Sequence, residues 1–457
     1  MDGVMAVLHL LLLCLMAGQA ASPAPTVTPG RVIEHVPCPS DPTQRYTLYL
    51  PSGYVTSRRW PLLFVFDPGA RAAPATEQFR AAAERYGWVI AASENSRNGP
   101  WGPNERAIAA MWPALLEGYA IDPSRIYTAG HSGGASMAWV VAKESGQVAG
   151  VIGSGQPGPG QESARPISFA WFGTAGFDDF NFLEVKGIDD RMKRLGKPHR
   201  LELFQGGHQW PPVELADAAL AWLELVAMKE GRRPRDSSLA ASMLADDLKR
   251  ARALDERGAL TDARRSYGAI VETYATLADV SEASTRLAAI DADTRFKDLR
   301  RREERSDDRE RERAASIDRM LARLAAEEPT SVSELRSMSS VDSILKASRG
   351  DSYEAGSARR SLELLFVQAT SARREFEARR DYGRAATALD LATGIHPERA
   401  ALWIELAADR AMSGHKSGAV TALQHAIEQG YTDKAALLRD ERFEKLRGTP
   451  AFDNIVK

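Results

Sequence analysis

Short strand-like segments alternate with helical segments between residues 30 and 230 of this 457-residue chain. Such alternation predicts an α/β fold with a doubly wound, mostly parallel sheet. The connecting loops are short, so we expect no cap or lid domain. The expected strands cover residues 45–50, 61–67, 88–92, 125–129, 148–153, 167–173 and 201–204, and the expected helices cover 76–86, 107–118, 135–144, 182–195 and 213–229.

One of these strands runs directly into a tight turn that carries a serine. The run Gly130–Gly134 reads G-H-S-G-G and joins strand 125–129 to a helical segment. This is the setting of a G-x-S-x-G nucleophile elbow, in which small flanking residues allow a sharp strand-to-helix turn. We therefore predict that Ser132 is a nucleophile and that the N–H of Gly133 faces the developing oxyanion. His131 is expected to pack at the elbow, with its side chain directed away from the nucleophile.

A base and an acid are expected in later loops of the same sheet. His208 follows the last strand in a glycine-bordered loop, which lets an imidazole approach the serine. Because the acid lies between the serine and the histidine in this triad order, the loop after strand 167–173 should supply it. That loop holds both Asp178 and Asp179. We favour Asp179, which opens a segment entering a helix, and keep Asp178 as the alternative acid; the other aspartate would be a helix N-cap.

A second oxyanion donor is expected in the loop after strand 61–67. The N–H groups of Gly69 and Ala70, together with that of Gly133, are the candidates, whereas Pro68 has no N–H to donate. The alternative is that this Pro-Gly pair only makes a turn.

Four residues are candidates for substrate binding. Asn95, Arg97 and Trp101 follow strand 88–92, on the edge where α/β sheets bind ligands, and Trp210 neighbours His208. Packing within the core is the alternative role for the two tryptophans.

These motifs resemble those of compact α/β-hydrolases of the carboxylesterase, dienelactone hydrolase and polyester depolymerase kind. The matching stretches are residues 46–51, 67–71, 130–135 and 206–208. The sequence departs from the pattern at Gly176, where many relatives carry the acid. The resemblance implies serine chemistry on a small-molecule or polymeric ester, with no metal and no organic cofactor.

The chain changes character after residue 230. We expect a catalytic domain at 30–230, a linker at 231–245, a helical region with a charged helix at 246–365 and a repeat-bearing helical domain at 366–457. The repeat has a period of 34, and its small or apolar residues let two helices pack closely, so it resembles tetratricopeptide repeats. Such repeats predict a possible protein partner. The recurring positions are Gly383, Ala385, Leu389 and Ala392, matched by Ser417, Ala419, Leu423 and Ala426.

Charge gives no reason to expect nucleic acid as a partner. The formal net charge is −2, and the charged stretch 295–313 mixes both signs with few aromatic residues. We expect that stretch to form a solvated or extended helix. The two cysteines, Cys14 and Cys38, cannot make a disulfide framework, and no metal-ligand spacing of Cys or His occurs.

The first 20 residues are expected to form a signal peptide. An apolar run at 5–17 is followed by small residues, and it is short for a membrane span. This predicts a periplasmic or extracellular protein. The alternative is a retained N-terminal anchor, the one case in which we expect membrane contact.

The sequence therefore predicts an exported serine hydrolase. Ser132, His208 and Asp179 would cleave a carboxylic ester through an acyl-enzyme intermediate. One alternative is an interaction scaffold whose repeats bind a partner while the hydrolase core is minor or inactive. A further alternative is a peptidase or acyltransferase with the same triad.

Overall fold

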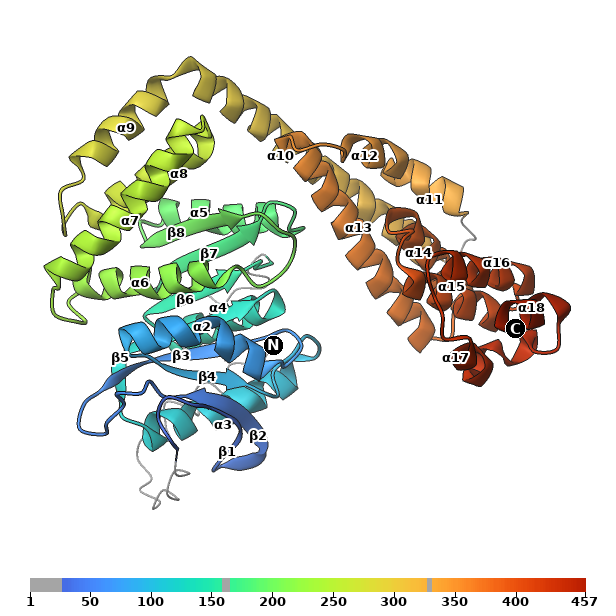
Figure 1. Cartoon of the computed structure of the whole chain (residues 1–457), viewed down its shortest axis with the longest axis horizontal. Coiled ribbons are helices and arrows are strands. Elements are labelled where there is room, and N and C mark those ends of the chain that lie inside the picture. Colours follow the sequence, from blue (N-terminus) through green and yellow to red (C-terminus); the bar gives the residue numbers. More distant parts are fainter. Residues whose placement is uncertain (1–26, 158–164, 327–330) are drawn as a thin grey trace. The chain divides into compact units, whose positions relative to one another are not determined.

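The computed structural model describes residues 27–157, 165–326 and 331–457, so the expected signal peptide lies outside the described residues. The chain divides into two compact units, one up to Arg300 and one from Arg301 onward, and the boundary falls within helix α10 (Thr294–Ala325) (Figure 1). Across the described ranges, no helix has the length and apolar character needed to cross a membrane.

An eight-stranded sheet forms the centre of the first unit. Its strands lie in the order β1-β2-β4-β3-β5-β6-β7-β8. Their bounds are β1 (Val32–Cys38), β2 (Asp41–Tyr49), β3 (Trp60–Phe66), β4 (Val89–Ser93), β5 (Ile121–His131), β6 (Gly150–Ser154), β7 (Ala170–Gly176) and β8 (His199–Phe204). The pairings from β4 through β8 are parallel, whereas β1–β2 and β2–β4 are antiparallel.

The predicted mostly parallel sheet with alternating helices is confirmed, and all seven expected strands are present. Strand β1 was not expected. Its sequence VIEHVPC has several exposed positions and lacks an apolar run, because the strand lies at the sheet edge and pairs only with β2. Its pairing depends on the hairpin with β2, which periodicity alone does not reveal.

Among the described residues of the first unit, nine helices follow the sheet strands or extend the unit up to the boundary in α10. In addition to α10, they are α2 (Ala72–Tyr86), α3 (Trp101–Gly118), α4 (Gly133–Ser145), α5 (Phe182–Arg194), α6 (Val213–Lys229), α7 (Ser237–Glu256), α8 (Leu260–Tyr274) and α9 (Ser281–Ala292).

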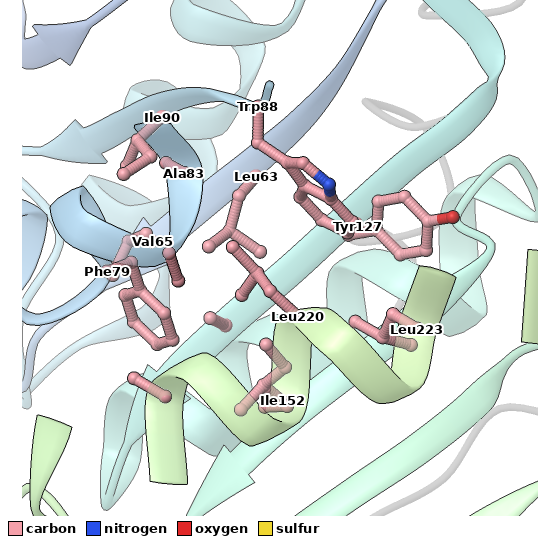
Figure 2. Packing of buried hydrophobic residues seen from close by; sticks show 14 of the residues in the cluster. Leu63, Val65, Phe79, Ala83, Trp88, Ile90, Tyr127, Ile152, Leu220 and Leu223 are labelled. Carbon is pink, nitrogen blue, oxygen red and sulfur yellow. The ribbon is translucent and has the colours of Figure 1, made fainter. Parts of the chain in front are cut away.

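Helices cover both faces of the sheet because successive strand residues point to opposite sides. Leu63 and Val65 of β3 belong to a buried cluster with Phe79 of α2 and Leu220 of α6 (Figure 2). The intervening Phe64 instead stacks on Trp112 of α3, with ring centroids 5.0 Å apart. Helices α2 and α6 therefore lie on one face, and α3 lies on the other.

Helices α7 to α9 belong to the same compact unit as the sheet. Leu225 and Met228 of α6 share a buried cluster with Leu244 of α7 and Tyr267 of α8. Helix α7 starts at Ser237, so the stretch 231–245 that we expected as a linker is helical from that residue onward.

A buried ion pair joins the sheet to these helices. Arg200 of β8 donates to both carboxylate oxygens of Asp247 in α7, each at 2.9 Å, and the Tyr274 hydroxyl donates to the same carboxylate at 2.9 Å. Burial raises the pKa of Asp247, but the charge and hydrogen bonds of Arg200 outweigh this, so the pKa lies below its ordinary value.

The second unit is all-helical in its described residues, and its helices pack as successive antiparallel neighbours. Together with the rest of α10, its elements are α11 (Val332–Ser339), α12 (Val341–Ala347), α13 (Tyr353–Ala378), α14 (Tyr382–Ile395), α15 (Ala400–Met412), α16 (Lys416–Glu428), α17 (Lys434–Arg439), the 3-10 helix η2 (Glu441–Leu446) and α18 (Pro450–Val456). The expected all-helical region is confirmed. The alanines and leucines at the recurring positions of α14 and α16 are buried, whereas Gly383 and Ser417 are exposed. Their assignment to tetratricopeptide repeats stays a prediction.

The charged stretch of α10 is less solvated than we expected. It is helical, but the buried Glu310 accepts hydrogen bonds from the buried Arg360 of α13, at 2.9 Å from Nε, and Asp307 accepts from the Tyr353 hydroxyl at 2.7 Å. Sequence pattern showed the mixed charges, but it could not show that α13 covers one side of them.

Loss of the Asp247 carboxylate should destabilise the first unit. In Asp247→Ala the buried Arg200 loses its partner, and breaking a buried pair in this way costs about 3 to 5 kcal/mol. Asp246→Ala removes the exposed neighbouring carboxylate and should change the free energy of unfolding little. Urea unfolding followed by tryptophan fluorescence measures both. Equal effects of the two variants would show that the Arg200–Asp247 pair does not stabilise this unit.

Candidate active site

Ser132 occupies a strained turn between β5 and α4. Its backbone has φ 53° and ψ −125°, in the left-handed half of conformational space that non-glycine residues rarely adopt. The Ser132 N–H donates to the carbonyl of Ser154 in β6 at 2.9 Å, and the Ser132 carbonyl accepts from Ala135 at 2.9 Å as α4 begins. A Cβ at Gly134 would collide with the carbonyl of Phe66, so the helix starts close against β3. The turn is held by neighbours on both sides.

His208 and Asp179 form an acid–base pair near this turn. His208 Nδ1 lies 2.9 Å from Asp179 Oδ1, and the Asp179 side chain is 0% exposed. The N–H of Asn181 also donates to Asp179 Oδ1, at 2.8 Å. Of the two candidate acids, Asp179 is the one that the structure pairs with His208. The N–H of Asp178 donates to the carbonyl of Gly206 at 2.9 Å, which joins the acid loop to the base loop.

Gly155 lies against this pair, a contact that we did not predict from the sequence. Its φ is 52°, and a Cβ there would be 2.6 Å from Asp179 Oδ2 and 3.0 Å from His208 Nδ1. Its carbonyl accepts from the Asn181 side chain at 2.9 Å. The only available signal was its place one residue after β6, on the sheet edge that also carries the serine. A side chain at this position would push the carboxylate and the imidazole apart.

Two rings flank the imidazole of His208. The Phe180 ring lies 4.2 Å away between centroids, and the His131 ring meets it edge-on at 4.6 Å. His131 also meets Trp210 edge-on at 5.6 Å and is 4% exposed. His131 therefore packs within the core, as expected of an elbow residue, but its packing partner is the ring of His208.

The loop after β3 is organised around the buried carboxylate of Asp67. Its Oδ1 accepts from the Gly69 N–H at 2.8 Å and from Arg71 Nε at 2.9 Å, and its Oδ2 accepts from the Trp210 indole at 3.0 Å. Burial raises the pKa of Asp67, but these hydrogen bonds, the Arg71 one foremost, hold it below its ordinary value. The carboxylate thus ties the loop after β3 to the loop that carries His208.

Two of the predicted oxyanion donors, the N–H groups of Gly69 and Ala70, already bond to Asp67. The Gly69 N–H is directed at the Asp67 side chain, and the Ala70 N–H donates to the Asp67 carbonyl at 3.1 Å. Both groups are occupied within their own turn, contrary to the expected free donors. Gly133 differs, because it is the first residue of α4 and its N–H has no acceptor within the helix.

A cavity of about 210 Å³ opens beside the residue that follows Ser132. Arg97 and Trp101, two of the candidate substrate-binding residues, line it. The complete lining is Phe66, Asp67, Ser96, Arg97, Asn98, Gly99, Trp101, Asn104, Gly133, Gly134, Ser136, Met137 and Val140.

Asn95 and Trp210 lie outside that lining. The Asn95 side chain accepts from the N–H of Arg45 at 2.7 Å and donates to the carbonyl of Thr43 at 3.2 Å, so it bonds to the segment of β2. Trp210 donates to Asp67 and packs edge-on against Phe79, with centroids 5.9 Å apart. Both side chains hold loops in place, a role that sequence alone did not separate from substrate contact.

No hydrogen bond joins Ser132 Oγ to His208 within the described residues. Because Nδ1 of His208 faces Asp179, Nε2 is the nitrogen left for the serine. Such bonds are often long in unliganded enzymes and tighten only when substrate binds.

No protein-family model matches the chain, and no curated protein matches it either. Several solved structures of serine hydrolases and esterases are similar to part of the chain. The fluorophosphonate-binding serine hydrolase F of Staphylococcus aureus is 14% identical, covers 43% of this chain and 98% of its own, and has a TM-score of 0.36.

Two further structures are similar over a comparable share of the chain. The S-formylglutathione hydrolase of Staphylococcus aureus is 12% identical, with coverage of 45% of this chain and 99% of its own and a TM-score of 0.36. A ferulic acid esterase is 17% identical, with coverage of 42% and 93% and a TM-score of 0.33.

Protonation of His131 should make the fold sensitive to acid. Burial, with a further contribution from His208, lowers the pKa of His131 from 6.5 to about 4. Between these two pH values the unfolded chain binds a proton that the folded chain does not, so stability present above pH 6.5 is lost as pH falls through the window. His131→Asn should lessen this loss by up to about 3 kcal/mol, the equivalent of the pKa shift.

Urea unfolding at pH 7 and at pH 4.5 compares the two proteins. His415→Asn, a change at an exposed histidine, serves as the control and should behave like the wild type. The same acid dependence in His131→Asn and wild type would contradict the prediction.

Proposed function

We propose that this protein is a serine hydrolase that cleaves a carboxylic ester. The observation that carries the proposal is the strained Ser132 turn on the same sheet edge as the buried Asp179–His208 pair. A backbone strain of this kind, on a serine next to an imidazole–carboxylate pair, matches the geometry of an activated nucleophile. The fold itself is α/β-hydrolase-like, with a mixed, mostly parallel eight-stranded sheet.

In the proposed reaction, Ser132 Oγ attacks the ester carbonyl while His208 Nε2 takes the serine proton. Asp179 holds the Nδ1–H tautomer and stabilises the imidazolium that forms. The ester C–O bond then breaks, and His208 returns the proton to the departing alcohol. Water, activated by the same imidazole, releases the acyl group from Ser132.

The small volume of the cavity beside Gly133 limits which part of a substrate can enter it. Its volume of about 210 Å³ is below the usual range for pockets that enclose a drug-sized ligand. We propose that a small acyl or alcohol group enters it between Trp101 and Met137, while the rest of a small-molecule or polymeric ester stays outside. Arg97 at its edge would contact that outer part.

Export and a role for the helical repeats belong to the same proposal. The apolar N-terminal run favours a periplasmic or extracellular location, which N-terminal sequencing of the mature protein would test. The paired helices α14, α15 and α16 are the surface that we propose for a protein partner.

A fluorophosphonate probe tests the nucleophile. Full-length wild type should be labelled and should hydrolyse short-chain nitrophenyl esters, whereas Ser132→Ala should lose labelling and at least about 1,000-fold in kcat, as when a triad serine is removed. Ser145→Ala, at the far end of α4 and outside the cavity lining, is the matched control and should still be labelled. A folded wild type that neither reacts with the probe nor cleaves any ester, thioester or peptide would favour the interaction-scaffold alternative.

Substitution of each aspartate tests whether Asp179 or Asp178 acts as the acid. Asp179→Asn keeps the side-chain shape but removes the charge that holds His208, so kcat should fall by about 10⁴-fold, as in other triads. Asp178→Asn should keep activity within about a factor of 3, because the carboxylate that is paired with His208 stays in place. Steady-state kinetics on a nitrophenyl ester measures both variants, and circular dichroism checks their folding. The reverse order of effects would identify Asp178 as the acid.

A further inference from the structure

The structure points to the side-chain amide of Asn98 as the second oxyanion donor, next to the N–H of Gly133. This inference rests on the proposed hydrolase function and names a catalytic residue for it. Asn98 follows β4 in the chain and lines the cavity that also contains Gly133. Sequence reasoning placed the second donor in the loop after β3 instead.

The loop after β3 is poorly placed to supply that donor. Pro68 has no N–H, and the N–H groups of Gly69 and Ala70 already bond to Asp67, at 2.8 Å and 3.1 Å. The N–H of Arg71 is directed at the same carboxylate, at 3.3 Å. Releasing the Gly69 or Arg71 N–H would leave the buried Asp67 carboxylate with fewer hydrogen bonds, which is costly for a buried charge. The Ala70 N–H is bound to the Asp67 backbone carbonyl instead. Because these three N–H groups already bond to Asp67, we look for the second oxyanion donor elsewhere.

The Asn98 amide lies directly over Gly133. A Cβ at Gly133 would collide with Asn98 Oδ1 and would lie 2.9 Å from its Cγ and 3.4 Å from its Nδ2. The amide is therefore in contact with the residue whose N–H begins α4. The oxygen and nitrogen of an asparagine side chain exchange places by a half-turn of the amide, so Nδ2 can take the position nearest the oxyanion.

The backbone around Asn98 is fixed although its side chain is exposed. The Asn98 N–H donates to the Pro68 carbonyl at 2.8 Å. The buried Asn104 of α3 accepts from the Arg97 N–H at 2.9 Å and donates to the Arg97 carbonyl at 3.0 Å. The Asn98 amide itself makes no hydrogen bond to other residues of the described chain, so its two N–H donors are available. A donor with an anchored backbone needs little reorganisation when charge develops.

The chemistry that this donor serves is the attack step. As the bond from Ser132 Oγ to the carbonyl carbon forms, the C=O electron pair moves onto oxygen, and the serine proton goes to His208. Asn98 Nδ2–H and Gly133 N–H would both donate to that oxygen, and the N-terminal end of α4 adds its positive dipole. When the ester C–O bond breaks, the electron pair returns and the proton passes to the alcohol.

Steady-state kinetics of full-length Asn98→Ala and Asn98→Asp on a nitrophenyl ester tests this role. Loss of one such donor lowers kcat by about 100- to 1,000-fold while KM changes little, because the donor acts mainly on the transition state. Asn98→Asp, which has nearly the same shape, should lose at least as much, because a carboxylate repels the oxyanion. Phenylboronic acid, whose serine adduct carries a tetrahedral oxygen, should bind both variants more weakly by a similar factor.

Asn454→Ala, an exposed asparagine far along the chain in α18, is the matched control and should keep wild-type kcat and boronate affinity. Thermal unfolding should give the same midpoint for every variant. An active wild type with unchanged kcat in Asn98→Ala, or with only a raised KM, overturns the role of Asn98 and leaves the proposed function standing. A wild type without any hydrolase activity or probe labelling overturns both.

Discussion

The parallel pairing of strands β3 to β8 is the constraint on which the site depends. Parallel strands end at the same edge of a sheet, so the loops that follow them meet there. The register places His131 of β5 opposite Ser154 of β6, and Ser154 opposite Thr174 of β7. The segments that follow β5, β6 and β7 therefore start side by side at the same edge of the sheet. They carry Ser132, Gly155 and Asp179, respectively. Their closeness follows from register, although they are far apart in the chain.

A second interaction holds the loops once they meet. The buried Asp67 carboxylate accepts hydrogen bonds from Gly69 and Arg71 in its own loop and from Trp210 in the loop that carries His208. An unpaired charge at this depth would be expensive, so its donors stay committed to it. The carboxylate that holds the His208 loop thereby also occupies the Gly69 N–H. In the reaction that we propose, the oxyanion partner therefore comes from a neighbouring loop.

The helices after residue 230 contribute to this same unit. The Arg200–Asp247 pair and the cluster around Tyr267 attach α7 and α8 to the last strand and to α6. Residues 231–238 have the composition of a linker, yet α7 already begins at Ser237. Interactions between distant segments decide where a compact unit ends, and local composition does not record them.

Sequence alone determined the alternation of strands and helices, the tight turn at Ser132 and the loops that hold Asp179 and His208. These are local patterns of period, turn chemistry and chain order, so a single sequence carries them. Tertiary structure decided which aspartate meets His208, that Gly155 touches both, that Asn95 bonds to β2 and that Asp67 occupies the N–H groups of Gly69 and Ala70. Each depends on side chains from different strands meeting at one edge of the sheet. The local sequence around a residue does not determine its distance from a residue far along the chain.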